Sequence, residues 1–419
     1  MIVREALDHG LRLVTEEMPH VRSVSIGVWL TRGSRHEHEE VSGIAHFVEH
    51  MLFKGTTTRT AEDIAQEIDS IGGQIDAFTS KEYAGYYIKA LDEHLPIALD
   101  VLSDVILHPA FDVEDIEREK KVVLEEIKMV EDTPDDLVHE LFMQQFWEGH
   151  PLGRPILGAR ETVEALNQQV LRDHFRQTYT APNLIVAAAG NLEHASIRDA
   201  VARTFSSVGL NGAAVVDRAP QVLPRVLTRF KDLEQSHIVL GTSAYPQSHD
   251  DRYVSYVLNT VLGGSMSSRL FQNIREKRGL AYAVFSGLSA YRDAGMFNVY
   301  AGCAAETVEQ VIDLVVEELR GMRRAPLPAA ELRRAKDHLK GNLMLGLEST
   351  SARMTHLARQ EIYFDKPYTL DDTLDGIDRV TGEDVQRVAS ALFADGALGL
   401  TVLGPNRNLE LPAGRLALD

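Results

Sequence analysis

The chain has 419 residues and a formal net charge of −19, with 44% hydrophobic and 25% charged residues. This length is too great for one ordinary hydrophobic core, and the composition is that of a globular protein, so two or more folded domains are expected. The acidic charge argues against a nucleic-acid partner, because phosphate binding requires a basic face, and it would suit a basic peptide.

Three features of the sequence bear on its compartment. Cys303 is the only cysteine, so an internal disulfide cannot form. The N-terminal residues lack the basic start and apolar stretch of a secretory signal. No run approaches the ~18 apolar residues that a membrane span needs. We therefore expect a cytoplasmic protein without a membrane partner.

The first half of the chain begins with a strand pattern, because apolar residues alternate over Val21–Thr31. Apolar residues at helical spacing predict helices at Gly43–Lys54, Thr60–Ile71, Leu95–Leu107, Val113–Val130, Leu137–Trp147 and Asn167–Tyr179. Alternation returns over Gln74–Leu91, and the apolar run Asn183–Gly190 predicts a buried strand at the end of this half.

The second half runs through a similar series, offset by about 213 residues, the separation of Asp100 from Asp313. Strands are predicted at His237–Tyr245, at Tyr282–Ala301 with a turn at Arg292–Gly295, and at Leu398–Gly404. Helices are predicted at Tyr253–Leu262, Met266–Arg278, Val308–Arg320 and Ala329–Leu345. One α/β domain is thus used twice.

The join between the halves is predicted within Ser206–Pro224, where small residues and prolines interrupt every pattern. The expected domains are therefore residues 1–210 and residues 225–419. The predicted fold class is α+β, with two related α/β domains that each consist of a mostly antiparallel sheet packed with helices.

A His-x-x-Glu-His pattern, formed by His46, Glu49 and His50, lies in the first predicted helix. Four residues turn a helix through about 400°, so both imidazoles face the same way and can reach one zinc ion. Glu49 can point at the open position of the metal without binding it. By spacing alone, the polar face of a surface helix is the alternative. The flanking glycine and apolar residues favour a buried helix, where unpaired His and Glu would be costly.

A catalytic zinc site needs a third protein ligand, and the best candidate is Glu126 in the helix Val113–Val130. Glu119 lies seven residues earlier on the same face, so it is predicted to orient a histidine or the water molecule. Glu125 is turned about 100° away and is expected to be solvated. Zinc would lower the pKa of a bound water to about 7, and Glu49 would accept the proton as general base.

The stretch HFVEHMLFKGT, residues His46–Thr56, closely resembles the pitrilysin family of zinc metallopeptidases, particularly mitochondrial processing peptidase and its bacterial relatives. The resemblance covers nearly the whole chain and includes Gly72–Glu82, Val122–Ile127 and Ile274–Tyr282. It implies one zinc ion per chain with Glu126 as third ligand, because the family places this glutamate about 76 residues after the second histidine. It also matches Glu119 to a glutamate that the family needs for activity.

The resemblance further implies substrate contacts in both halves. The family's edge strand beside the zinc, which binds substrate backbone, matches Ile75, Asp76, Ala77, Phe78 and Thr79. Many members have asparagine where this chain has Asp76, although strand addition through the backbone does not depend on that side chain. Arg275 and Tyr282 resemble an Arg–Tyr pair that contacts substrate near the metal. By sequence alone, Arg275 also fits a solvated helix end.

The second half lacks the metal set. At the position that corresponds to Glu126 it has Leu339, Lys340 or Gly341, depending on the offset, so we expect it to hold substrate. His36 and His38 suggest a second metal, but their acidic surroundings favour a solvated loop.

Three functional hypotheses follow. The first is a zinc endopeptidase that cuts short or unfolded peptides. The second is a non-catalytic binding or assembly subunit of the same family, and the third is a zinc hydrolase of non-peptide substrates. The presence of all five metal-site positions, His46, Glu49, His50, Glu119 and Glu126, favours the first. Family members enclose a chamber with four related domains, so a chain with two implies a homodimer.

Overall fold

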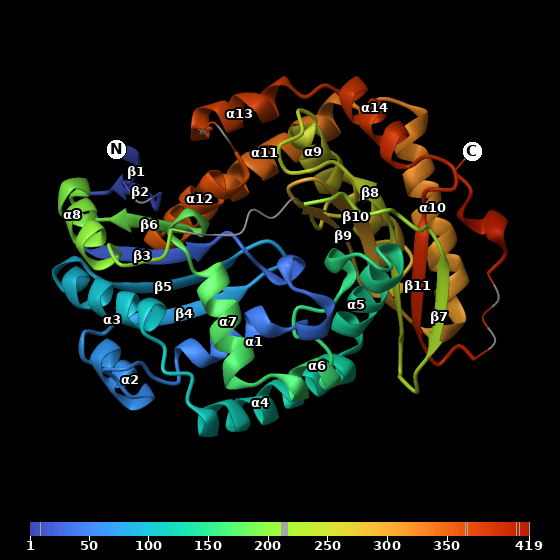
Figure 1. The fold of residues 1–419 in the computed structure, drawn as a ribbon. Coiled ribbons are helices and arrows are strands. Elements are labelled where there is room, and N and C mark those ends of the chain that lie inside the picture. Colours follow the sequence, from blue (N-terminus) through green and yellow to red (C-terminus); the bar gives the residue numbers. More distant parts are fainter. Residues whose placement is uncertain are drawn as a thin grey trace. The chain divides into compact units, whose positions relative to one another are not determined.

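The computed structural model describes residues 1–8, 10–210, 217–364, 366, 368–407, 409 and 411–418 (Figure 1). The fold is mixed α/β with two sheets, as the sequence predicts. The chain forms two compact units, each with its own sheet and hydrophobic core. The first unit comprises Met1–Met129, Arg154–Val216 and Gly346–Pro367, and the second comprises Val130–Gly153, Asp217–Leu345 and Tyr368–Asp419.

The sheet of the first unit has six strands. Their order is β1 (Ile2–Ala6), β2 (Arg12–Glu17), β6 (Leu184–Gly190), β3 (Ser23–Leu30), β5 (Ala84–Leu91) and β4 (Gln74–Thr79). Only β2 and β6 pair in parallel, and every other pairing is antiparallel. Strand β4 pairs with β5 alone, so it lies at the edge of the sheet.

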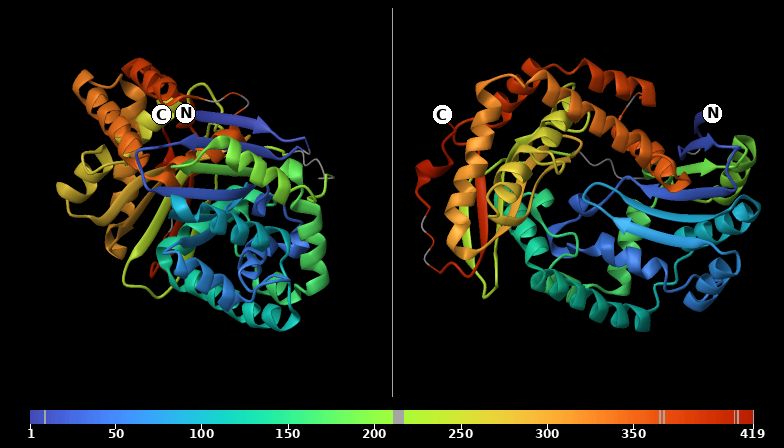
Figure 2. Two further views of the ribbon diagram at one scale, coloured as in Figure 1. Left: turned by 90° about the vertical axis from the view of Figure 1, so that its left-hand side faces the viewer. Right: turned by 180° about the vertical axis from the view of Figure 1, so that it is seen from behind.

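Helices cover both faces of this sheet (Figures 1 and 2). The first unit contains α1 (Ile44–Leu52), α2 (Ala61–Ser70), α3 (Leu95–Leu107), α6 (Arg160–Ala165), α7 (Gln168–Thr178), α8 (His194–Thr204), α12 (Thr350–Tyr363) and most of α4 (Val113–Asp132). Helices α1 and α3 share the core cluster on one face, whereas α12 packs on the other against buried Val14 and Trp29. The main core of the unit therefore lies between the sheet and α1, the helix that carries the His-x-x-Glu-His pattern.

The second unit repeats this arrangement. Its strand order is β7 (Val226–Phe230), β11 (Gly399–Gly404), β8 (Ser236–Ala244), β10 (Gly295–Cys303) and β9 (Ala281–Ala290), with only β7 and β11 parallel. Its helices are α5 (Pro134–Phe146), α9 (Arg252–Leu262), α10 (Val308–Arg324), α11 (Ala329–Gly346), α13 (Leu370–Arg379) and α14 (Gly382–Leu392). The order matches β2-β6-β3-β5-β4, which agrees with one domain used twice.

The compact units differ from the predicted ranges 1–210 and 225–419, because each contains a helix from the other half of the sequence. Helix α5 packs its apolar face on β8 and β11 of the second unit, and α12 packs on β2, β3 and β6 of the first. Helix α5 comes from the first half of the sequence but covers the sheet of the second unit. Helix α12 comes from the second half but covers the sheet of the first unit. The predicted join, Ser206–Pro224, includes residues 211–216, which lie outside the described residues.

Polar contacts hold the exchanged helix α12 in the first unit. The Ser25 Oγ atom lies 2.9 Å from both the Thr350 Oγ1 and the Ser351 Oγ atoms. Farther along α12, Arg353 forms an ion pair with Glu16 at 2.9 Å. Buried hydroxyl groups of this kind need partners, and these partners are available only when the helix lies on this sheet.

The strands and helices that the sequence predicts lie close to observed elements, apart from one segment. The patterns did not predict β1, β2, β7, α6, α8, α12, α13 or α14. The sequence predicts one helix over Met266–Arg278, but the regular element within this segment is a short π-helical segment, Phe271–Glu276. The loop before it runs close to β9, since a Cβ atom added to Gly263 would lie 2.3 Å from the Ser286 nitrogen. This close approach leaves no room for a side chain at position 263.

No helix within the described ranges is both long and apolar enough to cross a membrane.

Helix α7 carries a histidine, His174, whose environment predicts acid sensitivity. Burial, with a smaller contribution from nearby His38, lowers the pKa of His174 from 6.5 to about 4. The folded state therefore favours the neutral ring. Stability is fully retained above pH 6.5 and falls as the pH drops toward 4, because the unfolded chain then binds more protons. The shift corresponds to about 3 kcal/mol at most.

We expect His174→Gln to lose part of this pH dependence. Urea unfolding of the metal-free protein at pH 7.5 and pH 5 measures it, with chelator present so that metal release does not contribute. The difference in unfolding free energy between the two pH values should be smaller in the variant. An equal difference in both proteins would remove His174 as a source of acid sensitivity.

Candidate metal centre

The helix α1 presents one apolar and one polar face, which explains how its pattern is positioned. Its buried residues are Ile44, Ala45, Phe47, Val48, Met51 and Leu52. All of these residues except Ala45 join the core cluster against the sheet. The spacing that buries them leaves His46, Glu49 and His50 together on the remaining face.

The long helix α4 supplies two carboxylates to this face. The Glu126 Oε2 atom lies 3.8 Å from His46 Nε2 and 3.6 Å from His50 Nε2. One ligand atom from each of these three residues lies within 4.8 Å of the other two. The structure thus brings together the three residues that the sequence predicts as metal ligands.

These three residues fit a zinc ion, whose usual protein ligands are imidazole nitrogen and carboxylate oxygen. The Glu126 Oε2 atom is buried and has no hydrogen-bond partner among the described residues. An unpaired buried carboxylate oxygen is costly, and a cation beside it would remove that cost. Burial, and then the neighbouring His50, lowers the pKa of His46 to about 4, so its ring is neutral and able to bind metal at neutral pH.

No other group of three or more potential metal ligands with this spacing occurs in the described part of the chain. His36 and His38 belong to no such group. The His36 Nδ1 atom instead accepts a hydrogen bond from the Gly33 backbone nitrogen at 3.0 Å. This favours the loop interpretation of the pair over a second metal site.

Glu119 contacts His50 through the ring nitrogen that lies away from Glu126. Its Oε2 atom lies 3.0 Å from His50 Nδ1, and its Oε1 atom lies 2.7 Å from the Lys54 Nζ atom. A proton on His50 Nδ1 would satisfy this contact and leave the Nε2 lone pair directed at the site. The sequence predicts that Glu119 orients a histidine or the water molecule, and the structure places it beside His50.

Glu49 lies beside the three candidate ligands without joining them. The Thr79 Oγ1 atom donates a hydrogen bond to Glu49 Oε2 at 2.5 Å, which fixes the carboxylate from the side of β4. Burial raises the pKa of Glu49, and the Thr79 hydrogen bond partly opposes this rise. A carboxylate with a raised pKa is a stronger base, which suits proton transfer near neutral pH.

The predicted substrate strand, Ile75–Thr79, lies within the edge strand β4. Asp76 turns its carboxylate to its own sheet, where Oδ2 accepts a hydrogen bond from the Tyr87 hydroxyl at 3.0 Å. The Asp76 Oδ1 atom accepts from the backbone nitrogen of Ala77 at 2.8 Å. The side-chain role that the sequence leaves open is thus at least partly a local one.

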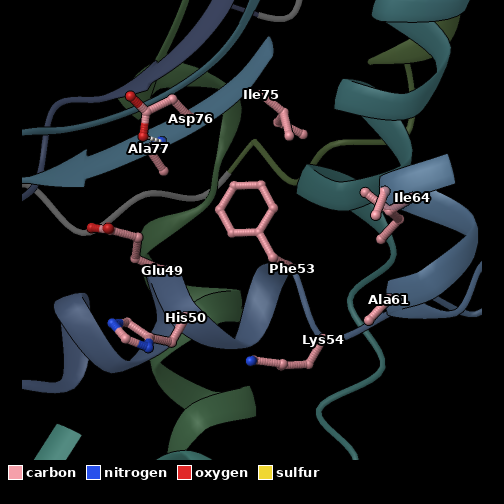
Figure 3. A pocket seen from close by; sticks show the side chains of 10 residues that line it. Glu49, His50, Phe53, Lys54, Ala61, Ile64, Ile75, Asp76 and Ala77 are labelled. Carbon is pink, nitrogen blue, oxygen red and sulfur yellow. Dashed lines mark hydrogen bonds between the residues drawn. The ribbon is translucent and has the colours of Figure 1, made fainter. Parts of the chain in front are cut away.

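A cavity of about 410 Å³ adjoins Glu49 and His50 between α1, α2 and β4 (Figure 3). It is lined by Glu49, His50, Phe53, Lys54, Ala61, Ile64, Ala65, Ile75, Asp76 and Ala77. Figure 3 shows the Phe53 ring standing between α1 and the strand that carries Ile75. A pocket with both apolar and charged walls beside a metal site could hold a substrate side chain.

The two remaining predicted site residues lie in the second unit. The Arg275 guanidinium lies 5.2 Å from the centre of the Tyr282 ring and 4.7 Å from that of Phe271. Tyr282 is 78% exposed, which is unusual for an aromatic residue of a strand. The structure therefore places Arg275 and Tyr282 side by side, and their contact with substrate stays a prediction.

Sequence reasoning missed three contributors to the site: Thr79 as the hydrogen-bond donor to Glu49, Lys54 as the partner of Glu119, and Phe53 as a cavity wall. Lys54 could have been found, because it follows His50 by four residues, about one helical turn, in the predicted helix Gly43–Lys54. The contact between Thr79 and Glu49 depends on where the edge strand crosses α1, which local sequence does not specify.

The comparisons with known proteins agree with this geometry. Residues 12–160 match the family described as insulinase (peptidase family M16), and residues 165–339 match the peptidase M16 inactive domain. A Bacillus subtilis protein named uncharacterized zinc protease YmxG is 44% identical over 98% of this chain and 100% of its own length. A Mycobacterium leprae protein, also named a zinc protease, is 41% identical over 96% of this chain and 92% of its own.

Solved structures share the fold. The peptidase M16 inactive domain from Pseudomonas fluorescens has a TM-score of 0.92 at 20% identity, covering 98% of this chain and all of its own. A protease from Helicobacter pylori has a TM-score of 0.89 at 23% identity, covering 97% of this chain and 99% of its own. The match in fold and the identity over nearly the full length agree with the resemblance noted from the sequence, and the chain belongs to peptidase family M16, the pitrilysin and insulinase family.

Proposed function

We propose that this protein is a zinc-dependent endopeptidase that hydrolyses short or unfolded peptides. The observation that supports this most strongly is the convergence of His46, His50 and Glu126, with Glu49 beside them. Relatives named as zinc proteases over nearly the whole length support the same activity.

A zinc ion bound to His46, His50 and Glu126 would supply a Lewis acid that makes a water molecule acidic and polarises the substrate carbonyl. In this proposal Glu49 accepts the proton from that water and later donates it to the leaving amine. Thr79 fixes the orientation of the Glu49 carboxylate through its hydroxyl. Glu119 holds the His50 ring and is itself held by Lys54.

Cleavage of a fluorescence-quenched, unstructured peptide, measured with and without zinc, tests this proposal. Peptide cleavage should be lost on treatment with a chelator and restored by one equivalent of zinc per chain. A protein that binds zinc and peptide but cuts no peptide bond would instead be the non-catalytic binding or assembly subunit. Cleavage of esters or other non-peptide compounds alone would favour the third hypothesis.

Substrate recognition in this proposal begins at the edge strand β4, whose outer backbone groups can pair with an extended peptide. Unfolded or short peptides should therefore be cut and a stably folded domain spared. The net charge of −19 further favours basic peptides, with a preference that salt weakens.

The cavity beside Glu49 predicts a preference for an apolar substrate residue next to the cut bond. Ala65 is exposed at the wall of this cavity on α2, so Ala65→Phe should fill space without disturbing the core. We expect kcat/KM to fall about 10-fold or more for peptides with a large apolar residue at that position and little for those with alanine. Peptide pairs that differ at this one residue measure the effect.

The matched control for this test is Asp69→Phe, which adds the same ring to an exposed position of α2 outside the cavity lining. This control should leave both substrates unchanged. An equal loss on both peptides in the Ala65 variant would argue against the cavity as a side-chain pocket.

We also propose that the working enzyme is a homodimer in which the second unit of one chain completes the metal site of the other. The support is the number of domains, because the family resemblance implies four in a chamber and one chain supplies two. Glu49 lies in the first unit, whereas Arg275 and Tyr282 lie in the second. A two-fold dimer is the commonest symmetric oligomer.

Mixing two inactive variants tests the shared site. Glu49→Gln and Arg275→Ala proteins, each inactive alone, should regain about a quarter to a half of wild-type activity after subunit exchange. Light scattering and exchange of labelled subunits confirm that mixed dimers form. No recovery despite proven exchange would place both groups in the site of a single chain.

A further inference from the structure

The first turn of α1 has no cap of its own. The residue that precedes the helix is Gly43, which has no side chain and adopts a left-handed conformation with φ of 95°. The first backbone N–H groups of any helix lack partners within it, and buried ones need an acceptor from elsewhere. The first turn of α1 contains His46, the third residue of the helix.

The missing acceptor is Glu37, which lies outside the helix. Its Oε2 atom accepts a hydrogen bond from the Gly43 backbone nitrogen, and its Oε1 atom accepts one from that of Ala45, each at 2.8 Å. Glu37 is only 6% exposed, so it is a buried carboxylate used entirely on the helix start. Burial raises the pKa of Glu37 to about 7, and the ionised form of its carboxylate complements the positive end of the helix dipole.

The segment that carries Glu37 is itself fixed. The Arg154 Nη2 atom donates a hydrogen bond to the Glu37 carbonyl oxygen at 2.8 Å. Two residues before it, the Arg35 backbone nitrogen donates to the Lys81 carbonyl oxygen at 2.7 Å. Lys81 follows closely after Thr79, which holds Glu49. The two contacts on α1, one at its start and one at Glu49, thus come from segments that are hydrogen-bonded to each other.

We infer that Glu37 is a positioning residue of the metal centre, which holds the first turn of α1 and thereby sets the affinity of His46 and His50 for zinc. This inference rests on the proposed zinc chemistry, because it assigns the function of the contact to the metal. Ala45, which Glu37 binds, is the direct neighbour of His46. A first turn that opens would move the His46 ring away from Glu126, while the core residues later in α1 stay packed.

The variant Glu37→Gln separates this role from a general one. It keeps the shape of the side chain, but an amide oxygen can accept only one of the two N–H groups and its NH₂ group faces the other. We expect zinc affinity, measured by competition with a chromophoric chelator, to fall about 10-fold or more, in the range of other groups that orient metal ligands. Backbone amides of residues 43–47 should exchange hydrogen about 10-fold faster in the metal-free variant.

Asp104→Asn is the matched control. Asp104 is a carboxylate of similar burial in the same unit, and it accepts hydrogen bonds from Thr56, Thr58 and Arg59, away from the start of α1. The Asp104→Asn variant should have a lower melting temperature, whereas its zinc affinity and the amide exchange of residues 43–47 should stay at wild-type values. A drop in zinc affinity equal to that of the Glu37 variant would mean that general destabilisation is the cause, which overturns the inference.

The remaining outcomes are equally decisive. Wild-type zinc affinity in Glu37→Gln overturns the positioning role. If that variant does not fold, Glu37→Asp, which keeps the charge but is shorter, takes its place: weakened zinc binding supports the role, and unchanged binding overturns it. A wild-type protein that binds zinc but cuts no peptide would defeat the proposed peptidase and leave the Glu37 measurements valid. A wild-type protein that binds no zinc would defeat both.

Discussion

Replacing Glu49 with glutamine is expected to abolish peptide hydrolysis and leave the zinc content unchanged. Glu49 lies beside the ligand set but is not part of it, so the three metal contacts persist in the variant. The glutamine oxygen can still accept the hydrogen bond from Thr79, so the local structure should also persist. What is lost is a group able to accept and donate a proton, and such groups contribute about 10²–10⁴-fold in rate.

The measurement combines turnover of a quenched peptide with metal analysis of the purified protein. We expect kcat to fall by at least about 10²-fold, at one zinc ion per chain and an unchanged melting temperature. Thr79→Val is the informative companion, because it removes only the hydroxyl that fixes Glu49 and should give a smaller loss. Full activity in Glu49→Gln would exclude Glu49 as the general base.

Replacing Glu126 with glutamine is expected to remove both zinc and activity. Glu126 contributes the only carboxylate of the three candidate ligands, and its Oε2 atom is the point nearest to both histidine Nε2 atoms. A neutral amide oxygen binds zinc far more weakly than a carboxylate, and the loss of a ligand also removes the metal's contribution to folding. Zinc should therefore dissociate on dialysis, and activity should return in part at high zinc concentration.

The adjacent glutamate provides a control of matched chemistry. The side chain of Glu125 is 67% exposed and pairs with Lys128 on the surface of α4. Glu125→Gln should keep wild-type zinc content and turnover. Equal losses in the two variants would point to a general effect of charge on α4, and retained zinc in Glu126→Gln would require a different third ligand.

Much of the metal centre could be predicted because its geometry is local. The spacing of His46 and His50 within one helix, and of Glu119 and Glu126 within another, determines which side chains share a face. The contact of one helix with the other came from the family resemblance, since no property of either helix alone specifies its partner. The contact between Glu37 and the start of α1 was not predicted, because the connecting loop has no regular periodicity.

The exchange of α5 and α12 between the sequence halves shows a second limit of prediction from sequence. Both helices have apolar faces that could pack on either sheet, so periodicity predicts the helix Leu137–Trp147 but not the sheet that it covers. The choice depends on tertiary contacts such as those of Ser25 with Thr350 and Ser351. Local pattern thus gave the internal repeat and many of the elements, but not α12 itself, and the composition of each unit required the structure.

The most direct test of the central claim is mass spectrometry of an unstructured peptide mixture after incubation with the zinc-loaded protein in water enriched in oxygen-18. A metallopeptidase that uses Glu49 to activate water should release fragments cut at internal peptide bonds, each with one heavy oxygen in its new carboxyl terminus. These fragments should be absent after chelation and in the Glu49→Gln variant, and should return when zinc is added to the wild type. Intact peptides in the presence of bound zinc would contradict the account and assign the chain a binding role.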